Sequence, residues 1–303
     1  MRSLAGFAMR GRSQAALVAA GSAVLSLIVP LVAVISSAVV ALATLRQGAR
    51  EGLLVAGIAG LGGAALAWLA LGTPWLGLGF FLVLWGPLWV LALVLRVTRN
   101  LALTVQGAAV AGLLILVGLH LAVDDPAAYW GKVMEPLRER LVEVGFIPEA
   151  ASREVMADLA KWMTGALAAS LYVQFLLALF LARWWQAVLY NPGGFGAEFR
   201  DLRLSPLLGY AVLALVGLRL WWPEALWGLE LLMLILPLLL LQGLAVAHGV
   251  RHSLGVGVGW LVAVYLVLVV AMPHGEVLVS GLGLVDLWLD VRGRVARRSA
   301  RRQ

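Results

Sequence analysis

The sequence predicts an all-α integral membrane protein, a bundle of about ten transmembrane helices with two amphipathic helices in one extracytoplasmic loop. Composition is the first reason: 62% of the 303 residues are hydrophobic and 13% are charged, against about 45–50% and about 25% in average globular chains. The second is run length, because a bilayer core of about 30 Å takes about 20 helical residues. The runs are unbroken rather than alternating, which favours helices over the strands of a transmembrane β-barrel.

Seven apolar runs have the length of a membrane span, and they lie at 52–71, 76–95, 101–123, 162–182, 205–221, 225–247 and 254–272. The run 14–45 would form one helix of about 48 Å, but Pro30 lies at its centre and interrupts helical hydrogen bonding. We therefore expect a hairpin of two short helices, 14–29 and 31–45. The run 277–289 is short, and predicts either a thin span or a re-entrant piece. If the doubtful pieces only enter the membrane, eight crossings remain.

Basic residues set the orientation of the chain. With ten crossings and a cytoplasmic N terminus, 17 of the 23 Lys and Arg residues face the cytoplasm, as the positive-inside rule requires. We expect both termini in the cytoplasm of a bacterial inner membrane, and one integral domain, 1–303, with a cytoplasmic loop at 183–204 and a basic tail at 292–303. The apolar stretch after Arg12 is longer than a signal-peptide core, so no cleaved leader is expected.

The long polar segment 124–161 carries a net charge of −3. Trp130, Met134 and Leu141 recur at helical spacing, and Pro148 suits the start of a second helix. These patterns predict two amphipathic helices on the outer membrane surface. They form either a lid over an outward-facing pocket or a connector without a ligand. The acidity disfavours anionic lipid as a partner for this loop.

The densest motif begins at Arg183 and runs to Arg203. Asn-Pro-Gly-Gly at 191–194 must end the preceding helix, because proline cannot continue it and glycine frees the backbone. Charged residues of both signs follow at 198–203, just before the start of the next predicted span. The segment is predicted to hold a partner or close an inner gate, and the alternative is a tight turn with interfacial Trp anchors. The candidate residues are Trp184, Trp185, Asn191, Glu198, Arg200 and Arg203.

Asp286 and Asp290 are the second candidate pair for a partner or gate. Their spacing of four places them on one face of a helix, and Asp290 has the same spacing to Arg294. A carboxylate near the last apolar run is costly and is usually partnered. We expect either an intramembrane function or a structural salt bridge, for example to Arg203 or Arg251.

Ligand contacts within the spans are predicted at Tyr172, Gln174 and Gln242, with interhelical hydrogen bonding as the alternative. His120 and Glu230 lie near span ends, where they would act as a proton relay or simply reach interfacial water. A ladder of small residues, Ala15, Ala19 and Ala23, lets another helix approach the first one closely, whether from this chain or from a partner.

Several classes of function lack their signatures. The chain has no cysteine and four scattered histidines, and it contains no Walker A, GxSxG, HExxH or strand-linked GxGxxG motif. We therefore expect no enzyme, metal or cofactor. The positive charge is confined to short clusters between apolar runs, which excludes a nucleic-acid partner.

Three segments carry a family resemblance: 183–206, 28–52 and 281–294. All three segments resemble the YybS-like family of uncharacterised bacterial membrane proteins. The first of them, 183–206, reads RWWQAVLYNPGGFGAEFRDLRLSP. That family is distantly similar to the substrate-binding S components of energy-coupling-factor transporters and to the cell-shape protein MreD. The resemblance implies an all-helical inner-membrane protein that captures a small molecule or holds a partner. The S components usually have six spans, so no pocket residues are carried over.

These observations predict a non-enzymatic, transport-type component that lies in the lipid bilayer, binds a small solute and works with partner subunits. ATP-driven work would need those subunits, because the chain has no nucleotide motif. The alternative is an MreD-like scaffold that recruits envelope machinery and binds no solute. A proton-coupled carrier acting alone ranks third.

Overall fold

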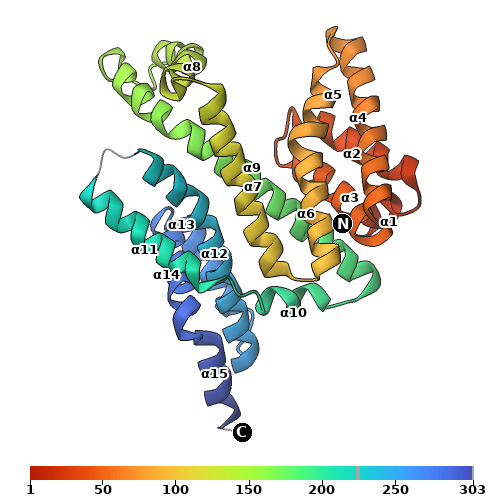
Figure 1. Ribbon diagram of the computed structural model, residues 1–303, viewed down its shortest axis with the longest axis vertical. Coiled ribbons are helices and arrows are strands. Elements are labelled where there is room, and N and C mark those ends of the chain that lie inside the picture. The colour runs from red at the N-terminus through yellow and green to blue at the C-terminus, as the bar shows by residue number, and fades with distance from the viewer. Residues whose placement is uncertain (223–225, 302–303) are drawn as a thin grey trace. The chain divides into compact units, whose positions relative to one another are not determined.

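The protein is described by a computed structural model, which covers residues 1–222 and 226–301, with the side chains at 70, 71, 76 and 300 left out. The described residues form helices and no strand (Figure 1), which confirms the all-α prediction. In chain order the helices are α1 (Arg2–Ala8), α2 (Arg12–Ser26), α3 (Val32–Gln47), α4 (Ala49–Leu71), α5 (Trp75–Gly79), the π-helix η1 (Phe80–Trp85), α6 (Gly86–Thr98), α7 (Leu101–Ala122), α8 (Pro126–Glu143), α9 (Glu149–Tyr190), α10 (Gly194–Arg200), α11 (Pro206–Trp221), α12 (Leu226–Leu254), α13 (Gly259–Val270), α14 (His274–Leu289) and α15 (Val291–Ala300).

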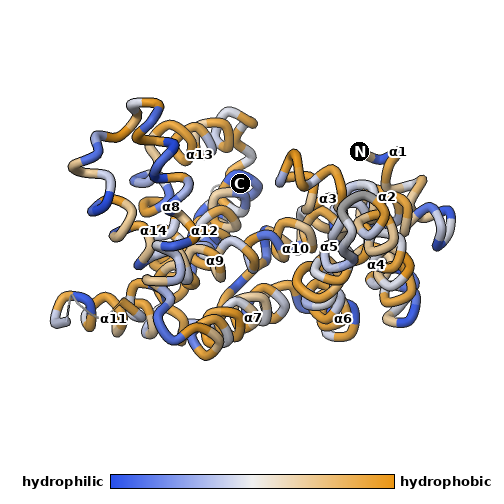
Figure 2. Tube along the Cα trace, turned by 90° about the horizontal axis from the view of Figure 1, so that it is seen from above, coloured by the Kyte–Doolittle hydropathy of each residue, from blue (hydrophilic) through white to orange (hydrophobic). Residues whose placement is uncertain are grey.

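Five stretches of helix in the described chain are long and apolar enough to cross a membrane: Ala49–Leu69, Gly77–Thr98, Leu101–Ala122, Glu149–Tyr190 and Leu226–Leu254. Three shorter apolar helices, α3, α11 and α13, add to them. Figure 2 shows apolar residues along most helices and hydrophilic residues mainly at their connections. The fold is therefore compatible with a multi-pass membrane protein. The number of ten crossings stays a prediction. Residue 225 of the predicted span 225–247 and residues 302–303 of the predicted basic tail lie outside the described residues.

The N-terminal apolar run is divided as Pro30 predicts. Helix α2 ends at Ser26 and α3 begins at Val32, with turns between them. The Ser36 hydroxyl on α3 donates to the carbonyl of Ala19 on α2 over 2.7 Å. Ala15, Ala19 and Ala23 are buried, and α2 packs on α3 and α4. The small-residue ladder is thus used within this chain.

Residues 75–98 form one helical path that changes its winding. Pro87 lies near the start of α6 and lacks the N–H that an α-helix would use to reach residue 83. The preceding turn widens into the π-helix η1, where the Gly86 N–H reaches back to the carbonyl of Phe81. A π-helix is a common result of such an interruption.

The loop 124–161 differs from the expectation of two surface helices. Its first half forms α8, but residues 149–161 continue without a break into the span, making the 42-residue helix α9. At 1.5 Å per residue α9 is about 63 Å long, about twice the bilayer core. Helix α8 packs on the N-terminal part of α9 through Met134, Met156 and Ala160. The segment is therefore a hairpin built on an extended span.

The packing of the helices divides the chain into two compact units. Unit 1 comprises residues 1–108 and 172–203, and unit 2 comprises residues 109–171 and 204–303. Helices α7 and α9 each contribute one part to both units. The prediction of a single integral domain stays a prediction.

Unit 2 is centred on the crossing of α12 and α14. A Cβ atom at Gly243 would lie 1.9 Å from the carbonyl oxygen of Val279, and one at Gly283 would lie 2.1 Å from that of Leu239. Both positions require glycine because the two backbones touch there. This close approach brings the polar residues of α12 and α14 together.

Candidate functional site

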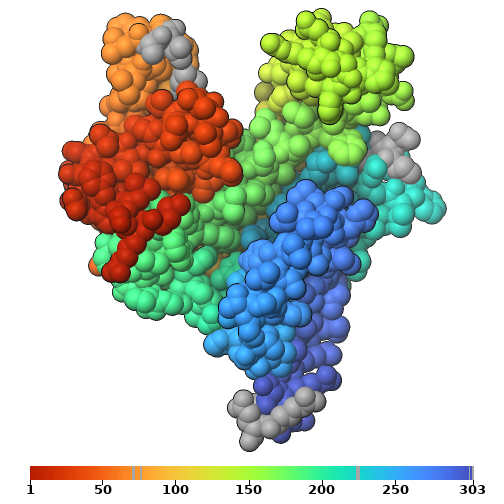
Figure 3. All heavy atoms as spheres, turned by 180° about the vertical axis from the view of Figure 1, so that it is seen from behind, coloured from red at the N-terminus to blue at the C-terminus, as the bar shows by residue number. Residues whose placement is uncertain are grey.

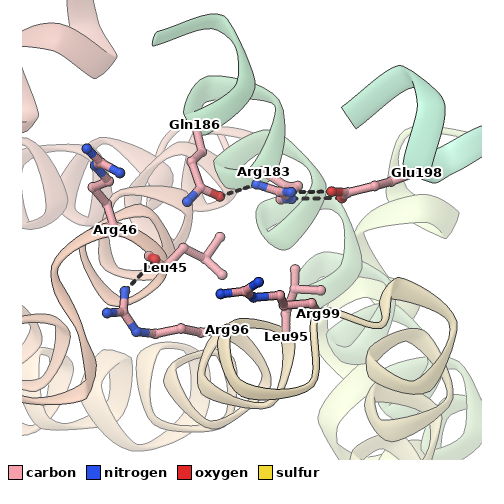
Figure 4. Close-up of a pocket in the computed structure, with 8 residues that line it drawn as sticks. All are labelled: Leu45, Arg46, Leu95, Arg96, Arg99, Arg183, Gln186 and Glu198. Atoms are coloured by element: carbon pink, nitrogen blue, oxygen red, sulfur yellow. Dashed lines mark hydrogen bonds and ion pairs between the residues drawn. The ribbon is translucent and has the colours of Figure 1, made fainter. Parts of the chain in front are cut away.

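One cavity in unit 1 is lined by four arginines. Its volume is about 500 Å³, and helices α3, α6, α9 and α10 and the turn after α6 surround it. Figure 4 shows the side chains arranged around one hollow. The lining residues are Leu45, Arg46, Leu95, Arg96, Arg99, Arg183, Gln186 and Glu198.

Two of the arginines occupy the last turns of apolar helices, Arg46 on α3 and Arg96 on α6. Cations are favoured there, because the last carbonyls of a helix lack partners and its C-terminal end is partially negative. Arg96 donates to the carbonyl of Leu45 over 2.6 Å, so it closes the end of the neighbouring helix α3. Arg96 therefore both shapes the cavity and lines it.

Arg99 lies in the turn between α6 and α7. Its φ of 52° is left-handed, which is uncommon for a residue with a side chain. The turn is fixed on its far side by Asn100, whose side-chain oxygen accepts from the N–H of Leu103 over 2.9 Å. This tight turn places the Arg99 side chain at the cavity.

The other side of the cavity is built by the motif around the end of α9. Helix α9 ends at Tyr190, and Gly193 has a φ of 86°, so the predicted helix break is confirmed. The return through α10 brings Glu198 to Arg183, where the two side chains form a bidentate ion pair. Arg183 also donates to Gln186. Arg46 lies over the ring of Tyr190, 4.1 Å from its centroid.

Charge in the cavity is unbalanced. Four arginines and one glutamate give the lining a net charge of +3. Glu198 is used by Arg183, and within the described chain no carboxylate lies within ion-pair distance of Arg46, Arg96 or Arg99. A cluster of like charges repels itself unless an anion joins it. The arrangement can therefore hold a small anion by charge-assisted hydrogen bonds.

The other motif residues have different environments. Trp185 is buried, and its indole nitrogen has no hydrogen-bond partner among the described residues, whereas Trp184 is 40% exposed. Asn191 follows α9, and its N–H donates to the carbonyl of Ala187 over 2.8 Å. Arg200 ends α10, and Arg203 lies exposed after it. Of the motif residues predicted as a site, Glu198 is the one that lines the cavity.

Gln242 and Asp286 belong to a buried network in unit 2. The Gln242 amide donates to Asp286 over 2.8 Å, and its oxygen accepts from the N–H of Leu204 over 3.1 Å. Arg292 forms an ion pair with Asp286 over 3.0 Å. A structural salt bridge of Asp286 is thus present, but its partner is Arg292 and not Arg203 or Arg251, which the sequence suggested. Ligand binding by Gln242 stays a prediction.

Asp290 lies outside helix α14, contrary to the expected common face with Asp286. Its φ of 45° ends α14 at Leu289, and its carboxylate then caps α15 by accepting from the N–H of Gly293. Asp290 lies 3.6 Å from Arg297, rather than showing the expected pairing with Arg294.

The two remaining ligand candidates lie in the part of α9 that belongs to unit 1. Tyr172 is fully buried. The Gln174 amide nitrogen is buried and has no hydrogen-bond partner within the described chain. Gln242 belongs to the other unit, so the three residues are not described as one site. Their role in binding a ligand stays a prediction.

His120 and Glu230 form a pair in unit 2. The His120 Nε2 atom lies 2.9 Å from a Glu230 oxygen, and the Glu230 side chain is 5% exposed. A Cβ atom at Gly165 on α9 would lie 2.9 Å from the Glu230 side chain, so Gly165 leaves room for it. His120 and Glu230 are thus partners of each other, a contact that the sequence did not indicate.

Sequence reasoning assigned Arg46, Arg96 and Arg99 to membrane orientation and missed their common cavity. A usable signal was present, because these residues end or follow apolar helices on the side where the Arg183 motif was placed. Convergence of arginines at one membrane face predicts an anion site only when their helices are neighbours, which the sequence did not establish.

Comparisons with known proteins add no relative. No family model matches the chain, and neither a curated protein nor a solved structure does. The resemblance to the YybS-like family therefore stays a prediction.

Proposed function

We propose that this chain is a multi-pass membrane component of transport type, and that the arginine cavity of unit 1 binds its solute, a small anion. The single observation that supports this most strongly is that Arg46, Arg96 and Arg99 line one cavity without a carboxylate partner in the described chain. A phosphate, sulfate or carboxylate group would supply the missing charge.

The chemistry of the lining suits a multidentate anion. Guanidinium groups present several N–H donors in a fixed plane, which match the oxygens of phosphates and carboxylates. Arg96 and Arg183 are already held by Leu45 and Glu198, so the lining is partly preorganised. Preorganisation lowers the entropy that binding must overcome.

The membrane topology in this proposal is that of the sequence prediction: about ten crossings, with both termini in the cytoplasm of a bacterial inner membrane. The cavity then opens at the cytoplasmic side, because its arginines are those assigned inside by the positive-inside rule. Partner subunits would supply energy. In this account the anion meets the protein at that face, and the α8–α9 hairpin is not the recognition element.

Anion binding is tested with protein purified in a neutral detergent. Isothermal titration uses inorganic phosphate and sulfate at constant ionic strength, with chloride as the reference anion. Arg99→Asn is the most informative variant, since asparagine tolerates the left-handed turn that Arg99 occupies. Loss of one charged hydrogen-bonding group costs about 1.5–3 kcal/mol, so we expect binding about 10- to 150-fold weaker.

Arg50→Gln is the matched control. Arg50 is exposed in the first turn of α4 and does not line the cavity, so its loss should leave affinity within about twofold. A lipid headgroup as the ligand would appear as an anionic phospholipid that co-purifies and is lost in Arg99→Asn. Equal anion binding by both variants would refute the proposal, and absence of anion binding together with a stable partner protein would support the scaffold alternative.

A further inference from the structure

Helix α15 of unit 2 presents a second group of arginines, none of which lines the cavity of unit 1. Arg294, Arg297, Arg298 and Arg301 follow one another at intervals of three, one and three residues, so they share one side of the helix. They line a hollow of about 190 Å³. The side chains of Arg294, Arg297, Arg298 and Arg301 are exposed. We call these four residues the arginine face.

The helix that carries the arginine face is anchored to the rest of unit 2. Arg292 forms a buried ion pair with Asp286, and its stem lies across Gly249 of α12, where a Cβ atom would approach it to 2.8 Å. Near the other end, the Ser299 hydroxyl donates to the carbonyl of Ser253 over 3.0 Å. The arginines therefore project from a fixed helix rather than from a loose tail.

The position of α15 along the chain places it at a membrane boundary. Its N-terminal cap, Asp290, directly follows the apolar helix α14, and α15 packs beside the C-terminal part of α12. Figure 3 shows the dark blue C-terminal segment at one end of unit 2. A helix at the end of two apolar helices begins where the hydrocarbon core gives way to headgroups.

Charge around the arginine face is poorly balanced. Asp290 lies 3.6 Å from Arg297, and Asp286 is already held by the buried Arg292. Anionic lipids give the cytoplasmic leaflet a negative surface potential that attracts basic segments next to a membrane helix. We infer that the arginine face binds the headgroups of anionic phospholipids and fixes the end of α14 and α15 to that leaflet.

The test compares lipid binding by the full chain before and after removal of these charges. Native mass spectrometry of the purified protein follows a titration with phosphatidylglycerol, with phosphatidylcholine as the uncharged reference. Each arginine near an anionic surface contributes about fivefold in affinity. The triple variant R294Q/R297Q/R298Q should therefore lose roughly one hundredfold in phosphatidylglycerol affinity and keep its phosphatidylcholine binding.

Three control variants make the result specific. The variant K132Q/R140Q/R153Q removes the same charge from exposed positions of the segment 124–161, which is predicted to lie on the outer side, and should keep the wild-type lipid preference. A triple lysine variant at 294, 297 and 298 should recover most of the affinity, which excludes loss through misfolding. Arg99→Asn should have no effect on this binding, so this inference and the proposed solute site fail independently.

Two outcomes would overturn the inference. One is an unchanged preference for phosphatidylglycerol in R294Q/R297Q/R298Q. The other is a nucleic acid that co-purifies with the wild type and is lost in this variant, since that would assign the arginine face to a different polyanion.

Discussion

Removal of Arg292 should destabilise unit 2 far more than removal of an exposed arginine nearby. The side chains of Arg292 and Asp286 are 7% and 2% exposed, and their atoms lie 3.0 Å apart. Arg292→Met keeps much of the stem volume over Gly249 but leaves the Asp286 carboxylate buried without this cation. Breaking a buried pair in this way costs about 3–5 kcal/mol.

The structure also predicts how the double variant behaves. Asp286→Asn keeps an oxygen that can accept from Gln242, which now donates to Asp286 over 2.8 Å. The double variant Asp286→Asn/Arg292→Met contains neither buried charge. Replacing a whole buried ion pair often changes the free energy of unfolding little. We expect the double variant to lose less than either single variant, so the coupling energy must be at least as large as the loss in Arg292→Met, about 3–5 kcal/mol.

The assay is unfolding of the purified protein in mixed micelles, with increasing dodecyl sulfate and tryptophan fluorescence as the signal. Arg297→Met is the matched control: this arginine is 65% exposed and 3.6 Å from Asp290. Exposed pairs contribute about 0–1 kcal/mol. Equal losses for Arg292→Met and Arg297→Met, or losses at 286 and 292 that simply add, would refute the assignment of a buried pair.

Three further predictions concern other parts of the chain. The natural sequence has no cysteine, so single cysteines at Asp201 and Gly131 should be labelled only from the cytoplasmic and only from the outer side respectively; the reverse pattern contradicts the topology. The hydrogen bond from Arg138 lowers the pKa of Glu135. Stability that this pair gives α8 above the unfolded pKa is thus lost as pH falls through the folded pKa. The protection of α8 amides, corrected for the intrinsic exchange rate at each pH, should therefore fall in that range and should not change there in Glu135→Gln. Gly243→Ala should lower stability by about 1–3 kcal/mol or more, because its Cβ would meet a carbonyl oxygen of α14; an unchanged thermal midpoint would contradict that close packing.

Local signals in the sequence predicted several elements correctly. Pro30 divides the N-terminal run, and the Asn-Pro-Gly-Gly segment ends α9 at Tyr190. Pro148 directly precedes the first residue of α9. Proline and glycine act on the backbone next to them, so their effects can be predicted without knowledge of distant contacts.

Other features depend on packing and could not be predicted in this way. Residues 149–161 were separated from the following span because polarity changes there, but a change of polarity does not break a helix. Asp290 adopts a left-handed backbone, which is uncommon for a residue other than glycine, and thereby removes the expected common face with Asp286. Such outcomes follow from the whole fold rather than from local spacing.

For the arginine cavity, too, one part could be predicted from the sequence and another part depends on packing. The sequence places Arg46, Arg96 and Arg99 at helix ends and predicts that they share one side of a membrane. Whether their side chains meet depends on which helices are neighbours. Only the packing of α3 against α6, and the return of α10 toward α9, brings them to one cavity with Glu198.

The central claim is that an anion occupies the cavity formed by Arg46, Arg96 and Arg99. A cryo-electron microscopy map of the protein in phosphatidylcholine nanodiscs, prepared with and without inorganic phosphate, tests it most directly. The account predicts added density within hydrogen-bond distance of at least two of these guanidinium groups, absent from the phosphate-free map and from Arg99→Asn. A cavity that stays empty in the map recorded at saturating phosphate would contradict it.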